Sequence, residues 1–270
     1  MRVRISHETV YTYEPEVAGA IQLLRVTPRS HEGQHVARWR IETSDDGQLA
    51  NYQDAFGNAS HWLSIDKTFS ELRILVEGEV ETHDTNGLVQ GALELFPPSL
   101  FLRETPITQT SPEIVSFVQD ACSGANNPLA CVHAVQTAIH GSLRFDTQAT
   151  DVATSAAEAF ASQHGVCQDF AHILIGAARH LGLPARYVAG HLLRHDGEVQ
   201  QEAGHAWAEV HIPDLGWVGF DPTNGVCPTD AYVRVAVGLD YLGATPVRGS
   251  VFGRAHESMR VSVEVEQAQQ

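Results

Sequence analysis

A cysteine, a histidine and an aspartate occupy three short segments whose residue types suit thiol chemistry. Cys167 follows a glycine-valine pair at the predicted start of a helix. His205 opens one predicted strand and Asp221 closes the next one. At the first turn of a helix, free backbone N–H groups and the helix dipole favour a thiolate over a thiol. The sequence therefore predicts an activated cysteine at position 167.

The spacing of His205 and Asp221 predicts that these two side chains meet. If their strands pair as a hairpin, the two residues lie side by side across the ladder. The aspartate then accepts a hydrogen bond from one ring nitrogen and leaves the other nitrogen facing the thiol. Nucleophilic thiol catalysis requires a thiolate, a base within reach and a third group that fixes the tautomer of the base. The backbone N–H of Cys167 would be one donor of the oxyanion hole.

Each of these residue types also has a structural interpretation. A buried cysteine is usually an inert small apolar residue, and this is the prediction for Cys122, Cys131 and Cys227. A lone histidine more often supports the fold, and an aspartate before a proline, as Asp221 is, can cap a turn. The ordered set of three favours the catalytic interpretation for Cys167.

The chain contains 15 histidines, which raises the question of a metal site. Five of them lie near the candidate residues in sequence, but none of these five has the HxH or HExxH spacing of a metal-binding pair, and no cysteine pair has CxxC spacing. The five are His164, His172, His180, His191 and His211. The sequence predicts no metal and no other cofactor.

The elements that must position the candidate site fall into two predicted domains. Alternation of apolar and polar residues over 3–11, 37–41 and 72–76 is typical of strands. Several short strands at this spacing predict an antiparallel β-sandwich-like domain over residues 1–105. The segment 96–112 contains four prolines and is the predicted linker.

The second predicted domain, residues 106–270, begins with helices and continues with strands. Ser111, Pro112 and Glu113 form a helix start, a second helix is predicted over 128–140, and Ser155 and Glu158 form a capping box. The helix that begins near Cys167 ends at a glycine and a proline. Strands are predicted from Ala185 on, including 206–212, 217–220, 232–237 and 259–265. The fold class is therefore α+β.

Composition excludes some classes of partner. Lysine and arginine number 17 against 33 aspartate and glutamate residues, which gives a formal net charge of −16. Nucleic acid and anionic membrane surfaces reward clustered basic residues, so neither is a predicted partner. The N-terminus lacks the apolar stretch of a signal peptide, and no run approaches the ~18 apolar residues of a membrane span. Four scattered cysteines are too few for a disulfide framework, so free thiols in a reducing cytoplasm are predicted.

Further motifs extend the pattern beyond the three residues. The segments 7–13 (HETVYTY), 24–29 (LRVTPR), 184–190 (PARYVAG), 235–241 (VAVGLDY) and 246–249 (PVRG) accompany the three candidate segments. Together they resemble the transglutaminase-like branch of the papain-like cysteine peptidase superfamily, and in particular the bacterial family in which an N-terminal β-domain precedes the core. The resemblance covers nearly the whole chain.

This resemblance implies a role for each matching residue. Cys167 would be the nucleophile, His205 the general base and acid, and Asp221 the group that orients it. Animal transglutaminases supply an indole upstream of the cysteine as second oxyanion donor, but no tryptophan lies between Trp62 and Cys167. Gln163 is one candidate substitute and Gln148 another. Gln168 and Trp207 are candidates for lining the cleft.

Two functions from different classes follow. The first is thiol-dependent acyl transfer on an amide or peptide bond, with release to water or to a primary amine such as lysine. The alternative is a non-catalytic scaffold that keeps the fold and binds a protein partner. A metallohydrolase is a third possibility without supporting spacing. The sequence does not predict the oligomeric state.

Overall fold

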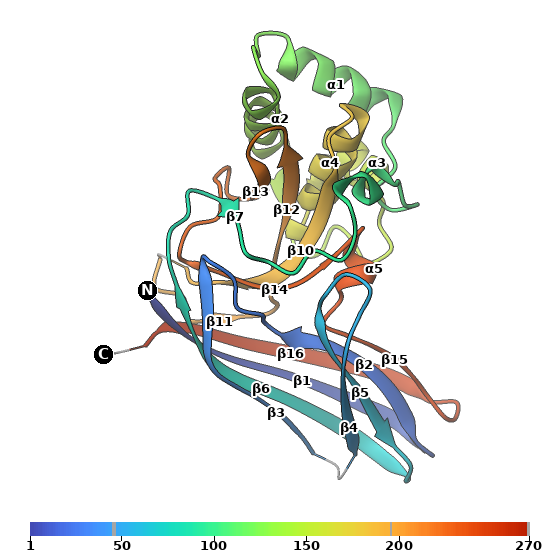
Figure 1. The fold of residues 1–270 in the computed structure, drawn as a ribbon. Helices are drawn as coiled ribbons and strands as arrows, with labels where there is room; N and C mark the ends of the chain where they lie inside the picture. The colour runs from blue at the N-terminus through green and yellow to red at the C-terminus, as the bar shows by residue number, and fades with distance from the viewer. Residues whose placement is uncertain (45–46, 195, 269–270) are drawn as a thin grey trace.

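The computed structural model describes residues 1–44, 47–194 and 196–268. Two antiparallel sheets form a sandwich in the lower half of the view, and a third sheet with the helices lies above it (Figure 1). The first strand of the chain, residues 2–17, and the last one, residues 256–267, pair with each other in the sandwich (Figure 1). Within the described ranges, no helix combines the length and the apolar character needed to cross a membrane.

Within the described residues, the sandwich contains nine strands. Its first sheet has, in spatial order, β11 (Gln200–Gln201), β16 (His256–Gln267), β1 (Arg2–Val17), β6 (Phe69–Thr82) and β3 (Gln34–Thr43). Its second sheet has β15 (Val247–Val251), β2 (Ala20–Thr27), β5 (Ala59–Ile65) and β4 (Gln48–Gln53). Side chains from both sheets, such as Ile74 and Leu63, share one buried apolar core. The sandwich-like architecture predicted for this region is confirmed.

The alternation in β1 and β6 is confirmed, whereas that in β3 is only partly right. The predicted inward residues of β1, from Val3 to Tyr11, are all buried. In β3, Trp39 and Ile41 are half-buried, but Ala37 is exposed. The pairing register with β6 shifts between Val36 and Arg38. Such a bulge breaks the two-residue period, because one extra residue reverses the face of those before it.

The last two strands of the chain complete the sandwich. β16 pairs with β1 from Val3 opposite Gln267 to Glu14 opposite His256, and β15 pairs with β2. The strand predicted over 259–265 is present, but residues 247–267 pair with the module that begins the chain. An apolar alternation marks a strand without indicating which sheet it joins.

The third sheet carries the helices. Its order is β14 (Tyr232–Gly238), β10 (Ala185–Leu192), β12 (His205–Ile212), β13 (Gly216–Phe220) and β7 (Leu88–Val89). The longer helices are α1 (Pro112–Cys122), α2 (Pro128–Ser142), α3 (Ala156–Ser162) and α4 (Cys167–His180). The shorter elements are η1 (Pro98–Leu102), β8 (Arg144–Phe145), β9 (His164–Gly165) and α5 (Tyr241–Ala244). The predicted caps at Ser111 and at the Ser155–Glu158 box are present.

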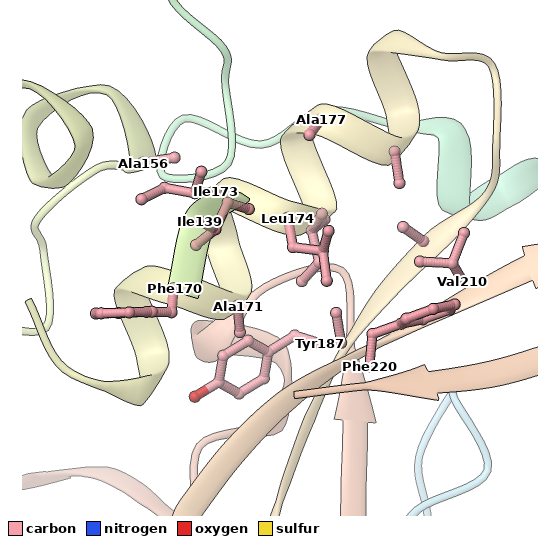
Figure 2. Packing of buried hydrophobic residues seen from close by; sticks show 14 of the residues in the cluster. Ile139, Ala156, Phe170, Ala171, Ile173, Leu174, Ala177, Tyr187, Val210 and Phe220 are labelled. Atoms are coloured by element: carbon pink, nitrogen blue, oxygen red, sulfur yellow. The ribbon is translucent and has the colours of Figure 1, made fainter. Parts of the chain in front are cut away.

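Helix α4 is the centre of this part of the molecule. Every residue from Gln168 to Arg179 is buried. Its apolar side chains pack with the other helices and against strand residues such as Tyr187 and Phe220 (Figure 2). A helix that is enclosed on all sides belongs to a core, so the position of its first turn is fixed by packing along its whole length.

The proline-rich segment 96–112 packs on the core as it connects the two parts. The Nε of Arg179 donates to the carbonyl of Phe101 at 2.9 Å, and its Nη1 donates to Thr108 Oγ1 at 2.8 Å. Phe101 and Thr108 are both buried. The predicted linker is therefore an ordered part of the helical core.

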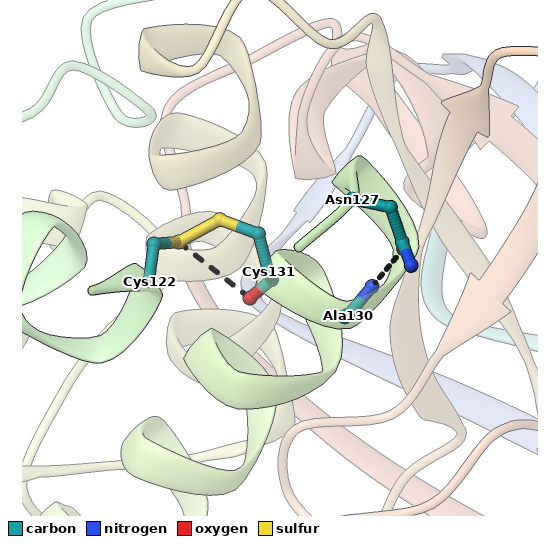
Figure 3. The surroundings of a disulfide bond; sticks show 4 residues. All are labelled: Cys122, Asn127, Ala130 and Cys131. Atoms are coloured by element: carbon teal, nitrogen blue, oxygen red, sulfur yellow. Dashed lines mark hydrogen bonds between the residues drawn. A yellow bond between two sulfur atoms is a disulfide. The ribbon is translucent and has the colours of Figure 1, made fainter. Parts of the chain in front are cut away.

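The prediction of four free thiols is wrong for one pair. Cys122 ends α1 and Cys131 lies in the first turn of α2, and the two form a disulfide with Cα atoms 4.8 Å apart (Figure 3). The short turn between the helices returns the chain, which brings the cysteines within bonding range. Cys167 and Cys227 are free. The cytoplasmic location stays a prediction.

Two side-chain amides join the sandwich to edge strand β14. Gln34 donates from Nε2 to the carbonyl of Arg234 at 2.9 Å and accepts from its N–H at 2.8 Å. Asn58 does the same with Val237, at 2.8 Å in both directions. Each amide thus pairs with one residue of the edge strand as a neighbouring strand would. The two amides fix the sheet of the core against the sandwich.

A buried histidine pair lies at the same junction. The rings of His7 in β1 and His191 in β10 meet edge to face with centroids 5.5 Å apart. Burial lowers the pKa of His7 to about 4, and burial together with the positive charge of His7 lowers the pKa of His191 to about 3. Both rings are therefore neutral near pH 7.

Because these two histidines are buried and neutral, we expect the folded protein to lose stability in acid. Because each pKa is lower in the folded than in the unfolded chain, the unfolded chain binds more protons below about pH 6.5, and stability falls as the pH falls. In His191→Phe, the loss of unfolding free energy between pH 7 and pH 5 should shrink by about 2 kcal/mol, the linkage expected for one such histidine.

Urea denaturation at the two pH values measures this difference. The matched control is His256→Phe, because His256 is exposed at the start of β16 and its substitution should leave the pH dependence unchanged. An equal acid loss in His191→Phe and the unsubstituted protein would contradict the prediction.

Candidate active site

Cys167 is the first residue of α4, as predicted. The carboxylate of Asp169 accepts from the N–H of Val166 at 2.8 Å and from Thr150 Oγ1 at 2.6 Å, which fixes the start of the helix. A Cβ at Gly165 would lie 2.7 Å from Asp169 Oδ2, so a side chain there would collide with this cap. The glycine before the cysteine is thus required by the capping carboxylate, and Thr150 is a supporting residue that the sequence analysis missed.

His205 and Asp221 meet, as their spacing predicted. His205 Nε2 lies 2.6 Å from Asp221 Oδ2, with 11% of the histidine side chain and none of the aspartate side chain exposed. Pairing between β12 and β13 ends at Ala208 and Phe220. The contact therefore spans the open end of the hairpin, beyond the last paired residues.

Three neighbours hold the Asp221 carboxylate in place. Tyr232 donates from its hydroxyl and Asn224 from Nδ2 to Oδ2, each at 2.7 Å. The backbone N–H groups of Thr223 and Asn224 donate to Oδ1 at 3.0 and 3.2 Å. Burial alone would raise the pKa of Asp221, but the hydrogen bonds and the charge of His205 lower it. The carboxylate is therefore ionised and oriented toward the imidazole.

Tyr232 and Asn224 were not identified from the sequence. Asn224 stands in the segment that contains Asp221, so its place three residues later is the signal that could have found it. Tyr232 belongs to strand β14, and no local pattern links it to Asp221. β14 and β13 are separated by β10 and β12 in the sheet, so only the tertiary fold brings Tyr232 to Asp221.

The His205 ring is oriented by its surroundings. It lies against Trp207, with ring centroids 6.2 Å apart, and against Tyr232 at 5.8 Å. Burial on its own would lower the pKa of His205, but the hydrogen bond to Asp221 and the interaction with Cys167 raise it to about 10. Because Nε2 faces the carboxylate, Nδ1 is the nitrogen left for the thiol. The structure thus brings all three candidate residues together.

The weaker candidates have other surroundings. Gln163 caps α3 with a left-handed backbone and an exposed side chain, and Gln148 is exposed. Gln168 is buried and donates to the carbonyl of Val152 at 3.4 Å. Trp207 is a buried aromatic beneath the His205 ring. None of these contacts tests a role in the oxyanion hole, so a second oxyanion donor stays a prediction. In the described part of the chain, no cluster of three or more histidine, cysteine or acidic residues could hold a metal.

Comparisons with known proteins agree with this arrangement. Residues 3–81 match the profile of the bacterial transglutaminase-like N-terminal region, and residues 115–222 match that of the transglutaminase-like superfamily. The fold and the site thus define a thiol-dependent catalytic fold of the transglutaminase-like superfamily. An uncharacterised protein of Mycobacterium leprae is 30% identical over 98% of this chain and 98% of its own length. The chain belongs to the bacterial transglutaminase-like family.

Two further proteins show more distant similarity. A crystal structure from Cytophaga hutchinsonii, provisionally assigned as a cysteine protease, is 22% identical and has a TM-score of 0.80 over 100% of this chain and 91% of that chain. This likeness shows the shared fold. A protein-glutamine gamma-glutamyltransferase of Pseudomonas aeruginosa is 36% identical over 87 residues, which is 30% of this chain and 12% of that protein.

The environment of His205 predicts an imidazolium that persists well above neutral pH. Nitrogen-15 NMR of labelled histidines should show a His205 pKa near 10. In Asp221→Asn the charged acceptor is lost, so this pKa should fall by more than about one unit. Tyr232→Phe is the milder comparison, since it removes only a donor to the carboxylate. An unchanged His205 pKa in Asp221→Asn would show that the aspartate does not stabilise the charged ring.

Proposed function

We propose that the protein transfers the acyl group of an amide or peptide bond through a thioester on Cys167. The observation that carries the proposal is the position of His205, which is hydrogen-bonded to buried Asp221 on one side and interacts with Cys167 on the other. The raised pKa of His205 favours a resting thiolate–imidazolium pair, the form in which the sulfur is nucleophilic.

The proposed reaction proceeds in two halves. The Cys167 thiolate attacks the carbonyl carbon, and the N–H of Cys167 at the first turn of α4 donates to the developing oxyanion. The tetrahedral intermediate collapses as the His205 imidazolium gives its proton to the leaving amine, which leaves a thioester and a neutral imidazole. His205 then takes a proton from the acceptor as it attacks the thioester, and the thiolate departs.

Asp221 serves this cycle as a positioning residue. It holds one ring nitrogen of His205, so that the other nitrogen faces the leaving amine in the first half and the acceptor in the second. Tyr232 and Asn224 hold the carboxylate itself. The substrate is a peptide or protein amide, and the acceptor is water or a primary amine. The name of the Cytophaga structure, a provisionally assigned cysteine protease, supports release to water. The name of the Pseudomonas protein, a protein-glutamine gamma-glutamyltransferase, supports transfer to an amine.

The alternative is a scaffold that binds a protein partner without turnover. A site without turnover would have no need for a buried aspartate that accepts hydrogen bonds from a histidine, a tyrosine and an asparagine side chain. Burial of such a charge is costly unless the charge is satisfied. The complete network around Asp221 therefore favours the enzyme.

Selective alkylation tests the nucleophile. Iodoacetamide at pH 6.5 should label Cys167 at least about tenfold faster than Cys227, because a thiolate stabilised by a cationic neighbour reacts faster than a half-buried neutral thiol. Burial raises the pKa of Cys227, which makes this thiol an internal control. In His205→Ala, labelling of Cys167 should slow by a similar factor while that of Cys227 stays the same. Equal rates for both thiols would contradict the proposal.

Product analysis tests the reaction. A library of peptide amides is incubated with the protein, with and without a primary amine, and hydrolysed or amine-conjugated products are identified by mass. Cys167→Ala should abolish product formation, and Asp221→Asn should lower kcat by about 10²–10⁴-fold, the usual range for loss of an oriented general base. Turnover by Cys167→Ala at the rate of the unsubstituted protein would exclude the thioester route.

A further inference from the structure

A cavity of about 510 Å³ lies where the sandwich meets β14, apart from the cysteine site. Its walls include Arg29 and His31 from the connection between β2 and β3, Asn58, and Arg234 of β14. Gln34 binds both sides of this junction, because its Nε2 donates to the carbonyl of Arg29 at 2.8 Å and to that of Arg234 at 2.9 Å. The side-chain amide of Gln34 therefore holds the backbones of Arg29 and Arg234 side by side in the wall of this cavity.

Two residues that line this cavity, Arg29 and His31, carry buried donor atoms without partners. Within the described part of the chain, Arg29 Nε and His31 Nε2 are buried and make no hydrogen bond. The N–H of Gly33 donates to His31 Nδ1 at 3.2 Å. Because Nδ1 accepts this bond in a neutral ring, the proton of His31 must be on Nε2. Burial, with the positive charge of Arg234, lowers the pKa of His31 to about 4, which keeps the ring neutral. The two atoms without partners, Arg29 Nε and His31 Nε2, are thus both hydrogen-bond donors.

In the described part of the chain, the other arginines near the cavity, Arg186 and Arg234, form ion pairs. Glu209, which is fully buried, accepts from Arg186 at 2.6 Å and from Arg234 at 2.7 Å. Glu94 in the cavity wall accepts two bonds from Arg186, at 2.8 and 3.0 Å. These two acids offset the charges of Arg186 and Arg234. Arg29 contacts the neutral amide of Gln53 at 2.9 Å, and it forms no ion pair within the described part of the chain.

A metal is not the expected occupant, although His31 begins a sequence of the HExxH form. That motif binds zinc on a helix, where residues four apart share one face. Here residues 31–35 lead from a turn into β3, and the His35 side chain is exposed. A cation would also face Arg29 and Arg234. The donors and the positive charge of Arg29 instead suit an anion.

We propose that this junction cavity binds a carboxylate or phosphate group, with Arg29 as its charge partner and the Nε2–H of His31 as a neutral donor. A second cavity of about 350 Å³ shares Arg29 as a wall. It also contains Thr27 Oγ1 and His61 Nδ1, which are buried without partners in the described chain. A ligand that extends from the junction cavity past Arg29 into this second cavity would therefore meet further polar groups there.

Calorimetric titration with inorganic phosphate and, separately, with succinate tests this site. The titrations use Cys167→Ala at pH 7.5 and constant ionic strength set by chloride, so the readout does not depend on catalysis. We expect saturable binding of at least one of the two anions, and the stronger binder identifies phosphate or carboxylate as the preferred group. In Arg29→Gln, which keeps most of the side-chain length, the Kd should rise at least tenfold.

The control for loss of a positive charge is Arg248→Gln, since Arg248 is exposed on β15; its Kd should match that of the parent. His31→Phe should also weaken binding, because it removes the donor and keeps a ring. The Tm of each variant without anion shows that the fold is intact. The proposal is overturned if neither anion binds above the chloride background, or if Arg29→Gln binds as tightly as the parent.

Discussion

The burial of α4 is the constraint on which the candidate site depends. From Gln168 to Arg179 every residue of this helix is buried, and its polar residues are held by specific partners. Asp169 caps the helix start, and Arg179 binds the carbonyls of the connecting segment and of β10. Since interiors are close-packed, such a helix cannot shift without disturbing its neighbours. Cys167 is therefore presented at a fixed place, at the end of the sheet where His205 and Asp221 lie.

The same sheet connects the site to the sandwich. Its helix-facing side is apolar, whereas the opposite side carries the chain of charges from Glu94 through Arg186 and Glu209 to Arg234. Arg186 also lies over the ring of Trp217, 3.9 Å from its centroid. Buried charges of this kind persist only when they are paired. The junction between the two parts of the molecule is thus polar and specific, and the amides of Gln34 and Asn58 fix its register.

Most local features could be predicted from the sequence. The caps at Ser111 and Ser155 and the start of α4 follow from interactions within a few residues, and so does the inward face of β1. Predictions that depended on residues far away in the sequence were wrong more often. Ala37 is exposed because of a bulge set by pairing with β6, and Cys122 reached Cys131 because two helices turn back on each other. Neither register nor helix–helix approach is encoded in a local period.

The sequence by itself determined which residues could react: a cysteine at a helix start, and a histidine and an aspartate at the ends of neighbouring strands. Residue type and short-range spacing suffice for that inference, since capping and hairpin geometry are local. Only the tertiary structure decided what surrounds them. Tyr232 reaches Asp221 from another strand, β15 and β16 return to the first module, and Arg29 meets the cavity beside Arg234. These contacts join residues far apart in the chain, and packing of the whole molecule selects them.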